Sequence, residues 1–367
     1  MAAGKQFNVS QWAQRPALAA VAAALLLSAC STTPTAPPVQ APAQPLPPPA
    51  PVVTQQQLAA RETLKTMSSL QDRLYHVGGP LLIQNADLCK SYARNLLGFT
   101  AKNRYSYPGD YSEASVAVLG YDDTLQVQNV LSGSGAQRAG LRKGDDLIAA
   151  DGKVLPKGRD AESKAAGVLG PLASSKATLP LTVARNGSNQ HTLNVPVTRA
   201  CAFRIDLGNA DNINSYADGG RVMLTRGMIN FAQSDEAIAY VMAKDIAHNV
   251  LGHAATLRNT STIGSIIDNL TSVHPDLSML VGSAGVRPMP QDMDIAADNL
   301  SLYMLARAGY NVDHAKAFWQ RLSSQYPATV LNGYTANHPS VSARLAAMDR
   351  TVAEIKAKQA AKRPLVP

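Results

Sequence analysis

The chain has few cysteines and lacks several short catalytic motifs. Its 367 residues contain only three cysteines, Cys30, Cys89 and Cys201, and no Cys-x-x-Cys spacing. That absence argues against a thioredoxin-like redox motif and against a zinc ribbon. The sequence also has no phosphate-binding glycine loop and no Ser-His-Asp order, so nothing in it indicates a nucleotide-binding enzyme or a serine hydrolase.

The N-terminal apolar run, residues 16–27, is too short to span a bilayer comfortably. It follows Lys5 and Arg15, which predicts a secretory signal over residues 1–29. The run ends in Leu27-Ser28-Ala29-Cys30, which resembles the lipobox of bacterial lipoproteins and implies that Cys30 is lipidated. The residue after Cys30 is Ser31 and not an aspartate, which favours a protein anchored in the outer membrane and facing the periplasm. The alternative is an ordinary cleaved signal with an unrelated cysteine.

Charge is missing altogether from residues 32–55, which are rich in proline, alanine and glutamine. Such a segment cannot bury a core, so residues 30–56 are predicted to be a tether. The precursor carries a net charge of +8, and loss of Lys5 and Arg15 with the signal leaves +6. The positive residues are scattered apart from a run in the C-terminal tail, residues 356–367, which favours contact with anionic lipid over nucleic acid.

With Cys30 lipidated, Cys89 and Cys201 remain as an exported pair. Such a pair is more often a disulfide than two free thiols, although two unrelated buried cysteines are the alternative. The pair flanks an inserted unit. Before it, the apolar spacing predicts a helix over residues 56–75 and a short strand at residues 81–83.

The inserted unit has a recognisable order of elements. An alternating strand at residues 125–130 is followed by Ser132-Gly-Ser-Gly-Ala-Gln-Arg-Ala-Gly140 and then by Gly144-Asp-Asp-Leu-Ile148. This order resembles a bacterial PDZ domain, here placed over residues 114–198, with a helix near residues 160–169 and two later strands. PDZ domains bind peptide ends by strand addition. The candidate carboxylate loop is Leu119, Gly120 and Tyr121, and an ordinary turn before a strand is the alternative.

The rest of the chain is organised around residues 234–253, which are predicted to form one amphipathic helix. Ser234 is a good N-cap, and apolar residues then recur at helical spacing. Lys244 and His248 are four residues apart and therefore share a face. A His-Glu-x-x-His motif at this position would supply two zinc ligands and a general base, but here it reads Lys244-Asp245-Ile-Ala-His248.

The string from Asn214 to His253 resembles the CAAX prenyl endopeptidase and HtpX-like family of gluzincin metallopeptidases (peptidase family M48). Asp294-Ile-Ala-Ala-Asp298 resembles the family's third-ligand helix, and Asn337-His338-Pro339 resembles its C-terminal His-Pro segment. The resemblance implies an α+β fold: a helical gluzincin domain with a small edge sheet over residues 57–113 and 199–355, interrupted by a PDZ-type, β-barrel-like domain.

By this resemblance, the metal positions are His248, Asp294 and Lys244, the last in place of a ligand histidine. Asp245 occupies the position of the base, and His338 is a possible cleft residue. The family's substrate lies along the edge strand before the active helix, here Val222 and Leu224, with Asn214, Tyr216 and Ala217 as the neighbouring wall.

The departures from the family pattern fall on the chemistry. A lysine ligates zinc only when it is neutral, and deprotonating it at pH 7 costs about 4–5 kcal/mol. Aspartate is one methylene shorter than glutamate, so Asp245 falls short of a metal-bound water and Asp294 is a shortened ligand. We therefore expect no zinc and an ion pair from Lys244 to Asp294 or Asp245.

Two functions follow from this reading. The first is a catalytically impaired lipoprotein that binds peptides or envelope proteins, such as unfolded or outer-membrane proteins, through its PDZ unit and relic cleft. The alternative is an active zinc-dependent metalloendopeptidase in envelope protein quality control, in which case Zn2+ is the cofactor.

Overall fold

The structure is a computed structural model that describes residues 53–185, 187, 189–280, 283–327, 333–339 and 341–367. The predicted signal segment, the lipidation site Cys30 and nearly all of the predicted tether lie outside the described residues. The expected end of the tether at residue 56 is too late, because helix α1 begins at Gln55. Among the described residues, no helix has the length and apolar character needed to span a membrane.

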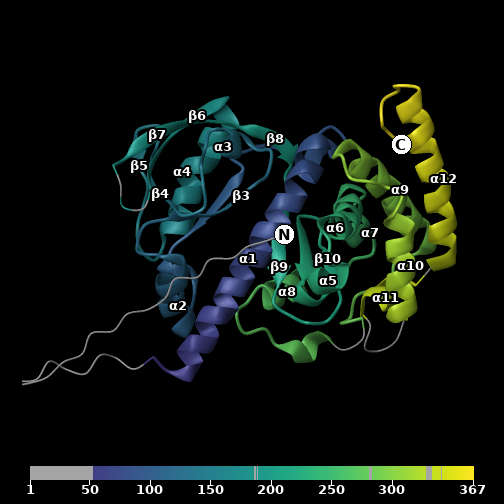
Figure 1. Ribbon diagram of the computed structural model, residues 1–367, viewed down its shortest axis with the longest axis horizontal. Coiled ribbons are helices and arrows are strands. Elements are labelled where there is room, and N and C mark those ends of the chain that lie inside the picture. The colour runs from purple at the N-terminus through teal and green to yellow at the C-terminus, as the bar shows by residue number, and fades with distance from the viewer. Residues whose placement is uncertain (1–52, 186, 188, 281–282, 328–332, 340) are drawn as a thin grey trace, which may run out of the picture. The chain divides into compact units, whose positions relative to one another are not determined.

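Helix α1 (Gln55–Gln84) contacts elements of both the inserted unit and the peptidase-like part (Figure 1). It begins with a capping box, in which Thr54 and Gln57 exchange hydrogen bonds between side chain and backbone. The helix is longer than the predicted 56–75. The expected strand at residues 81–83 is wrong, since those residues form the last turn of α1.

Two glycines that suggest the end of a helix instead mark close packing inside it. A Cβ on Gly79 would lie 2.2 Å from the Ser132 carbonyl oxygen, and one on Gly78 would lie 2.4 Å from Ile205 Cδ1. Tertiary contacts therefore explain the glycines, and Pro80 follows them within the helix. Sequence propensity alone gives the opposite reading.

A two-stranded antiparallel ribbon forms the base of the inserted unit. Strand β1 (Ala93–Leu96) pairs with β8 (Thr198–Cys201), and Ala93 lies opposite Cys201. At the end of the ribbon, the Cys89 and Cys201 sulfurs are bonded and their Cα atoms are 5.5 Å apart. This is within the ~7 Å that a disulfide requires. The bond links the entry and the exit of the insertion.

The inserted unit is built on an open six-stranded sheet in the order β2-β3-β4-β6-β7, with β5 paired to β4. The strands are β2 (Phe99–Lys102), β3 (Gln126–Val130), β4 (Asp145–Ala150), β5 (Lys153–Val154), β6 (Thr178–Arg185) and β7 (His191–Pro196). Helices α3 (Gly135–Arg138) and α4 (Ala161–Ser175) contribute to its own hydrophobic core. The sheet is not a closed barrel, which corrects the barrel-like expectation.

The predicted start of this unit at residue 114 is also wrong. Strand β2 begins at Phe99 and pairs with β3, so the sheet begins earlier in the chain. Residue 114 lies within helix α2 (Asp110–Leu119). This helix buries Tyr111 and Ala114 in a small cluster with Leu64 of α1. Helix α2 thus separates the first two strands of this sheet in the sequence. The alternating pattern of a strand does not reveal such an intervening helix.

The peptidase-like part has a three-stranded sheet in the order β10-β11-β9. Its strands are β9 (Arg204–Gly208), β10 (Ser215–Ala217) and β11 (Arg221–Thr225). The prediction that Val222 and Leu224 lie on an edge strand is wrong, because β9 pairs in parallel along the second side of β11. Both side chains are fully buried. The edge strands are β10 and β9.

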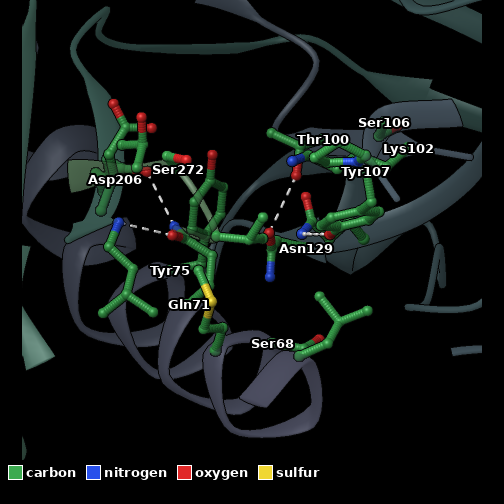
Figure 2. A pocket seen from close by; sticks show the side chains of 18 residues that line it. Ser68, Gln71, Tyr75, Thr100, Lys102, Ser106, Tyr107, Asn129, Asp206 and Ser272 are labelled. Carbon is green, nitrogen blue, oxygen red and sulfur yellow. Dashed lines mark hydrogen bonds between the residues drawn. The ribbon is translucent and has the colours of Figure 1, made fainter. Parts of the chain in front are cut away.

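The free edge of β9 is covered by a side chain of α1. The Gln71 amide nitrogen donates to the Ile205 carbonyl at 2.9 Å, and its oxygen accepts from the Leu207 N–H at 2.9 Å (Figure 2). Gln71 thus replaces one residue of a neighbouring strand. β10 remains as the edge of this sheet beside the candidate site.

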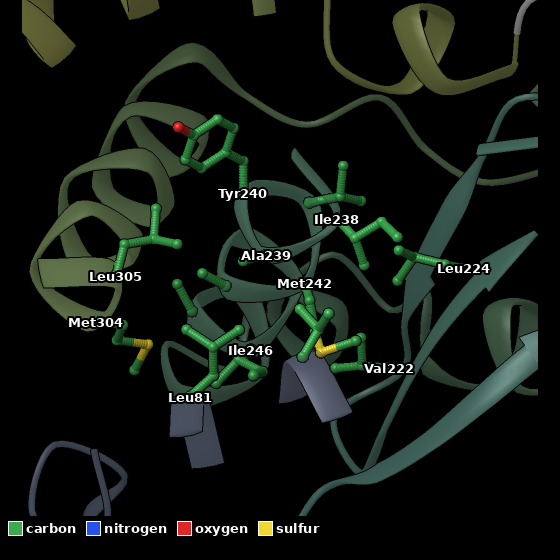
Figure 3. Close-up of a cluster of buried hydrophobic side chains, with 14 of the residues drawn as sticks. Leu81, Val222, Leu224, Ile238, Ala239, Tyr240, Met242, Ile246, Met304 and Leu305 are labelled. Carbon is green, nitrogen blue, oxygen red and sulfur yellow. The ribbon is translucent and has the colours of Figure 1, made fainter. Parts of the chain in front are cut away.

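Helix α6 (Asp235–Val250) is the centre of the larger hydrophobic core. The Ser234 hydroxyl accepts from the Ala237 N–H, and two acids occupy the first turn. Residues 237–249 are all buried, so the helix is enclosed and not amphipathic as predicted. Figure 3 shows Ile238, Met242 and Ile246 among side chains of α1, β11 and α9. α6 ends before His253, which begins α7.

The remaining helices are α5 (Arg226–Ala232), α7 (His253–Thr256), α8 (Thr260–Leu270), α9 (Gln291–Arg307), α10 (Ala315–Gln325), α11 (Gly333–Asn337) and α12 (Val341–Ala360). Most of them pack on this core, whereas α7 and α8 bury their apolar residues in a smaller cluster with Tyr216 and Met223. The predicted basic tail from residue 356 begins inside α12. Its Lys358 pairs with Glu354 at 2.7 Å, and Arg307 donates to the Leu365 carbonyl, so the end of the chain is tied down.

Candidate functional site

Four segments bring the candidate site together below the edge strand β10. The predicted residues that meet there are Lys244, Asp245 and His248 from α6, Asp294 from α9, and His338, which directly follows α11. Asp298 of α9 and Arg344 of α12 join them. All are buried. This cluster is the cleft that the sequence analysis named the relic cleft, and that name is kept below.

Lys244 lies at the centre of the charge network with no exposed surface. Its Nζ is 2.7 Å from Asp294 Oδ1 and 3.3 Å from Asp298 Oδ1. The predicted ion pair between Lys244 and Asp294 is therefore confirmed. The ammonium also lies 5.2 Å from the centre of the Trp319 ring. Burial and the nearby Arg344 charge lower the pKa of Lys244, and the two carboxylates oppose that effect.

Asp298 and Arg344 form a second ion pair that the sequence analysis did not assign. Arg344 Nε and Nη2 donate to the two Asp298 oxygens at 2.6 and 3.0 Å, and Nε is 3.6 Å from Asp294 Oδ2. The site thus holds two cations and two carboxylates that neutralise each other. The signal was present in the sequence, since Asp298 closes the Asp294 motif and Arg344 follows the His-Pro segment.

Asp294 is the acceptor that joins the network. Burial raises the pKa of Asp294, but the charge of His338, which is protonated only at the low pH where Asp294 itself titrates, and the charges of Lys244 and Arg344 outweigh burial and hold that pKa well below 3.8. His338 Nδ1 lies 2.8 Å from Asp294 Oδ1, so His338 belongs to the site. Burial lowers the pKa of His338 to about 4. The histidine is therefore neutral at pH 7 and donates to a charged carboxylate.

His248 faces Asp294 on one side and His253 on the other. Its Nδ1 is 2.9 Å from His253 Nδ1, and its Nε2 is 3.5 Å from Asp294 Oδ1. Among the described residues, no group forms a hydrogen bond with His248 Nε2. His253, the first residue of α7, contacts the predicted ligand His248 and helps to orient its ring.

Three of these side chains offer metal-ligand atoms within 4.8 Å of one another: His248, Asp294 and His338. The unpaired His248 Nε2 fits such a role. The charges of the site do not fit a metal ion. Asp294 is the one member of this set that would bring negative charge, and Lys244 and Arg344 already neutralise Asp294 and its neighbour Asp298. Zinc would lie beside an ammonium that repels it by several kcal/mol, about twice the ~4 kcal/mol of two unit charges at 4 Å in an effective dielectric of 20. The residues therefore fit the zinc implied by the resemblance poorly.

Asp245 is the residue that the family resemblance assigns to the position of the general base. Burial raises the pKa of Asp245 to about 7, and its Oδ2 forms no hydrogen bond among the described residues. It lines a cavity of only about 30 Å3 together with Ser215, Tyr216 and Ala217 of β10. Such a volume holds about one water molecule and no peptide.

The predicted substrate wall is partly reassigned. Tyr216 and Ala217 line the cavity, as expected for a wall. Asn214 is buried beside it, where its side-chain amide donates to the Tyr216 hydroxyl at 2.8 Å. Val222 and Leu224 lie in the core and do not line the cavity. The available strand edge at this cleft is therefore β10.

The predicted carboxylate loop does not lie at a groove. Leu119 ends α2, Gly120 is its C-cap with φ 71°, and Tyr121 is buried with its N–H donating to the Ser115 carbonyl. These residues close a helix. The expectation arose because the Leu-Gly-Tyr string precedes a strand, but the helix before it was not recognised.

A groove exists elsewhere in the inserted unit, between the β1–β2 connection and helix α4. A cavity of about 480 Å3 lies there, lined by residues 96–99 and by one face of α4 that includes Ala166, Leu169 and Ala173. Among the described residues, the N–H groups of Leu97 and Gly98 have no hydrogen-bond acceptor. Gly98 has φ 81°, which favours glycine.

Strand β2 leads directly from these two amides and is the edge strand of its sheet. The signal that sequence reasoning missed is the string Leu96-Leu97-Gly98-Phe99, a glycine between apolar residues at the start of a strand. Free amides beside a free strand edge are suited to an extended chain that ends in a carboxylate.

Comparison with known proteins adds a family to this geometry. Residues 191–352 match Peptidase family M48. The mitochondrial metalloendopeptidase OMA1 of Schizosaccharomyces pombe is 24% identical over 147 residues, which cover 38% of this chain and 44% of that protein. The beta-barrel assembly-enhancing protease of Escherichia coli is 28% identical over 166 residues, which cover 39% of this chain and 33% of that protein.

The chain thus spans less than half the length of these relatives. Among solved structures, the HtrA3 PDZ domain bound to a phage-derived ligand covers 29% of this chain and 88% of its own, at 17% identity and a TM-score of 0.22. A TM-score this low does not establish a common fold. The sequence matches and the arrangement of α6, α9 and the His-Pro segment point to the same region: residues 191–352 are similar to Peptidase family M48.

Proposed function

We propose that this chain is a lipid-anchored, peptide-binding protein of the bacterial cell envelope whose M48-type site no longer cleaves peptide bonds. One observation carries the proposal: a buried lysine ammonium, 2.7 Å from Asp294, stands where the family has a ligand histidine. Asp245 at the base position adds support, because its side chain is shorter than glutamate. The cleft itself has room for about one water molecule.

Peptide binding is assigned to the inserted unit. An extended ligand would add to the edge of β2 and place its terminal carboxylate at the Leu97 and Gly98 amides. Its last side chain would lie against Leu169 and Ala173 of α4. β10 offers a second strand edge at the relic cleft, open to a ligand only if the cleft widens.

The envelope location rests on two features of the chain. The Leu27-Ser28-Ala29-Cys30 string supports lipidation at Cys30, and Ser31 supports the outer membrane. The Cys89–Cys201 disulfide is of a kind that persists in oxidising compartments such as the periplasm. The E. coli relative is named for assembly of β-barrel proteins, which supports unfolded or outer-membrane proteins as clients.

The alternative is an active zinc-dependent metalloendopeptidase in envelope protein quality control. It is favoured by the close approach of His248, Asp294 and His338, in which His338 would take over from the missing histidine. Metal analysis of the purified protein and a casein-cleavage assay with and without added zinc decide between the two. We expect less than stoichiometric zinc and no cleavage. Stoichiometric zinc with chelator-sensitive cleavage would refute the inactive assignment.

Binding is tested with labelled peptides that end in a free or an amidated carboxyl group. We expect the full chain to bind only the free form. Ala166→Arg fills the groove from an exposed position on α4 and should weaken binding, whereas Ser163→Arg, exposed on the same helix outside the groove, should not. Equal binding of the amidated peptide would exclude this groove.

A further inference from the structure

A second cavity lies on the other face of strand β2, and it contains an unpaired cation. The cavity has a volume of about 240 Å3 and lies between β2, β3, α1 and β9 (Figure 2). Lys102, the last residue of β2, lines it with its Nζ 4.9 Å from the centre of the Tyr107 ring. Among the described residues, no acid lies within ion-pair distance of Lys102, and none accepts a hydrogen bond from its Nζ.

The nearest acids are engaged with other groups. Asp206, across the cavity, accepts from Arg204 Nε at 2.8 Å. Glu162 accepts from the Ser106 hydroxyl. Burial lowers the pKa of Lys102, which reflects the cost of holding this ammonium in the cavity wall. An acid brought by a ligand would relieve that cost without displacing an existing pair.

The alternation of β2 divides its side chains between the two cavities. Phe99 and Ala101 pack with the hydrophobic core of the inserted unit, whereas Thr100 and Lys102 line the second cavity. Tyr75 of α1 and Ile205 of β9 line both cavities, so the two spaces adjoin beside β2. A strand added to β2 would likewise direct alternate side chains to the two sides.

The geometry fixes the direction of such a ligand. Its carboxylate lies at Leu97 and Gly98, before the first residue of β2, so the ligand runs antiparallel to the strand. Phe99 then lies opposite the last ligand residue, and Lys102, three residues further along, lies opposite the residue three positions before the last.

We propose that Lys102 makes the groove selective for peptide ends with an acidic side chain three positions before the C-terminal residue. This inference rests on the peptide-binding function proposed above and names its ligand class. The selecting cavity is built partly by α1 and β9. Selectivity is therefore a property of the full chain and not of the inserted unit alone.

The test uses the full chain and an array of synthetic peptides with free carboxyl termini, from which the tightest binder is taken. Variants of that peptide with Glu, Gln or Lys at the named position are then measured by fluorescence anisotropy. We expect Glu to bind about fivefold to tenfold more tightly than Gln, as for a charge-assisted contact in a partly buried setting, and Lys to bind most weakly.

Lys102→Met should remove the preference for Glu over Gln, and Lys102→Glu should invert the preference between Glu and Lys. Lys153→Met, at an exposed lysine of β5, is the matched control and should leave the preference for Glu over Gln intact. If binding requires the free carboxyl terminus but its affinity does not depend on the acidic side chain or on Lys102, this inference is overturned and the proposed function still stands. If no peptide with a free carboxyl terminus binds, both fail.

Discussion

Replacing Lys244 by methionine tests whether its ammonium holds the relic cleft together. Methionine has nearly the same length and no charge, so it removes the ion pairs to Asp294 and Asp298 with little change in packing. Asp298 keeps its two hydrogen bonds from Arg344. The uncompensated charge therefore falls mainly on Asp294, which keeps the contact with neutral His338 and the more distant Arg344 Nε at 3.6 Å.

The magnitude follows from the 2.7 Å separation of Lys244 Nζ and Asp294 Oδ1. Two unit charges at that distance attract by about 6 kcal/mol in an effective dielectric of 20. The variant no longer desolvates an ammonium, which offsets part of this loss. The free energy of unfolding should fall by about 3–5 kcal/mol, the usual cost of breaking a buried pair from one side.

The assay is urea unfolding of the native protein and the variant in the presence of a chelator, so that no added metal replaces the lost cation. Lys316→Met breaks an exposed pair with Asp349 and should cost no more than about 1 kcal/mol. Adding Asp294→Asn to Lys244→Met should restore part of the stability. A Lys244→Met variant within about 1 kcal/mol of the native protein, or a double variant as unstable as the sum of the single variants, would show that the pair does not stabilise the fold.

Three further predictions follow. The triple variant Lys244→His, Asp245→Glu, Asp294→Glu supplies three ligands and a base of adequate reach. Metal analysis of this variant should therefore detect bound zinc, and a casein assay should detect some cleavage. A metal-free triple variant would show that the surrounding charges also exclude zinc. Burial raises the pKa of Asp245 to about 7, whereas the unfolded value is about 3.9. Protonation therefore stabilises the folded state fully below about pH 4, and that contribution of about 4 kcal/mol is lost as pH rises through 7. Asp245→Asn should flatten this part of the profile in urea unfolding near pH 5 and near pH 8, and an unchanged profile would assign it to another group. Replacing Cys89 and Cys201 together by alanine removes the disulfide, which joins residues 112 positions apart. The free energy of unfolding should fall by about 2–5 kcal/mol, measured by thermal and urea unfolding. No loss of stability would mean that the ribbon is stable without the disulfide.

Local spacing predicted the organising helix and its charged face, whereas Asp294 and His338 were assigned to the cluster from the family resemblance. Four-residue spacing placed Lys244 and His248 on one face of α6. The charge argument, that a lysine near Asp294 must pair with it, predicted the contact now seen at 2.7 Å. Ser234 is the N-cap that its position indicated.

The rest depends on contacts between distant segments. The predicted end of the first helix near residue 75 was too early, because Gly78 and Gly79 pack against distant segments of the chain within the same helix. The edge assignment of β11 failed because β9 adds to it in parallel from an earlier stretch of sequence. The carboxylate loop was misplaced because α2 separates the first two strands of the inserted sheet.

The ribbon at the base of the inserted unit makes that unit an exchangeable cassette. Leu96 and Thr198 are the last residues paired across β1 and β8. A short turn can join two antiparallel strands at such a point, so the chain closes without residues 97–197 and the peptidase-like part keeps its route. The Cys89–Cys201 bond lies outside the exchanged segment. A gene can thus gain, lose or replace the inserted unit by a change at one hairpin, while the cluster around Lys244 keeps its supporting helices.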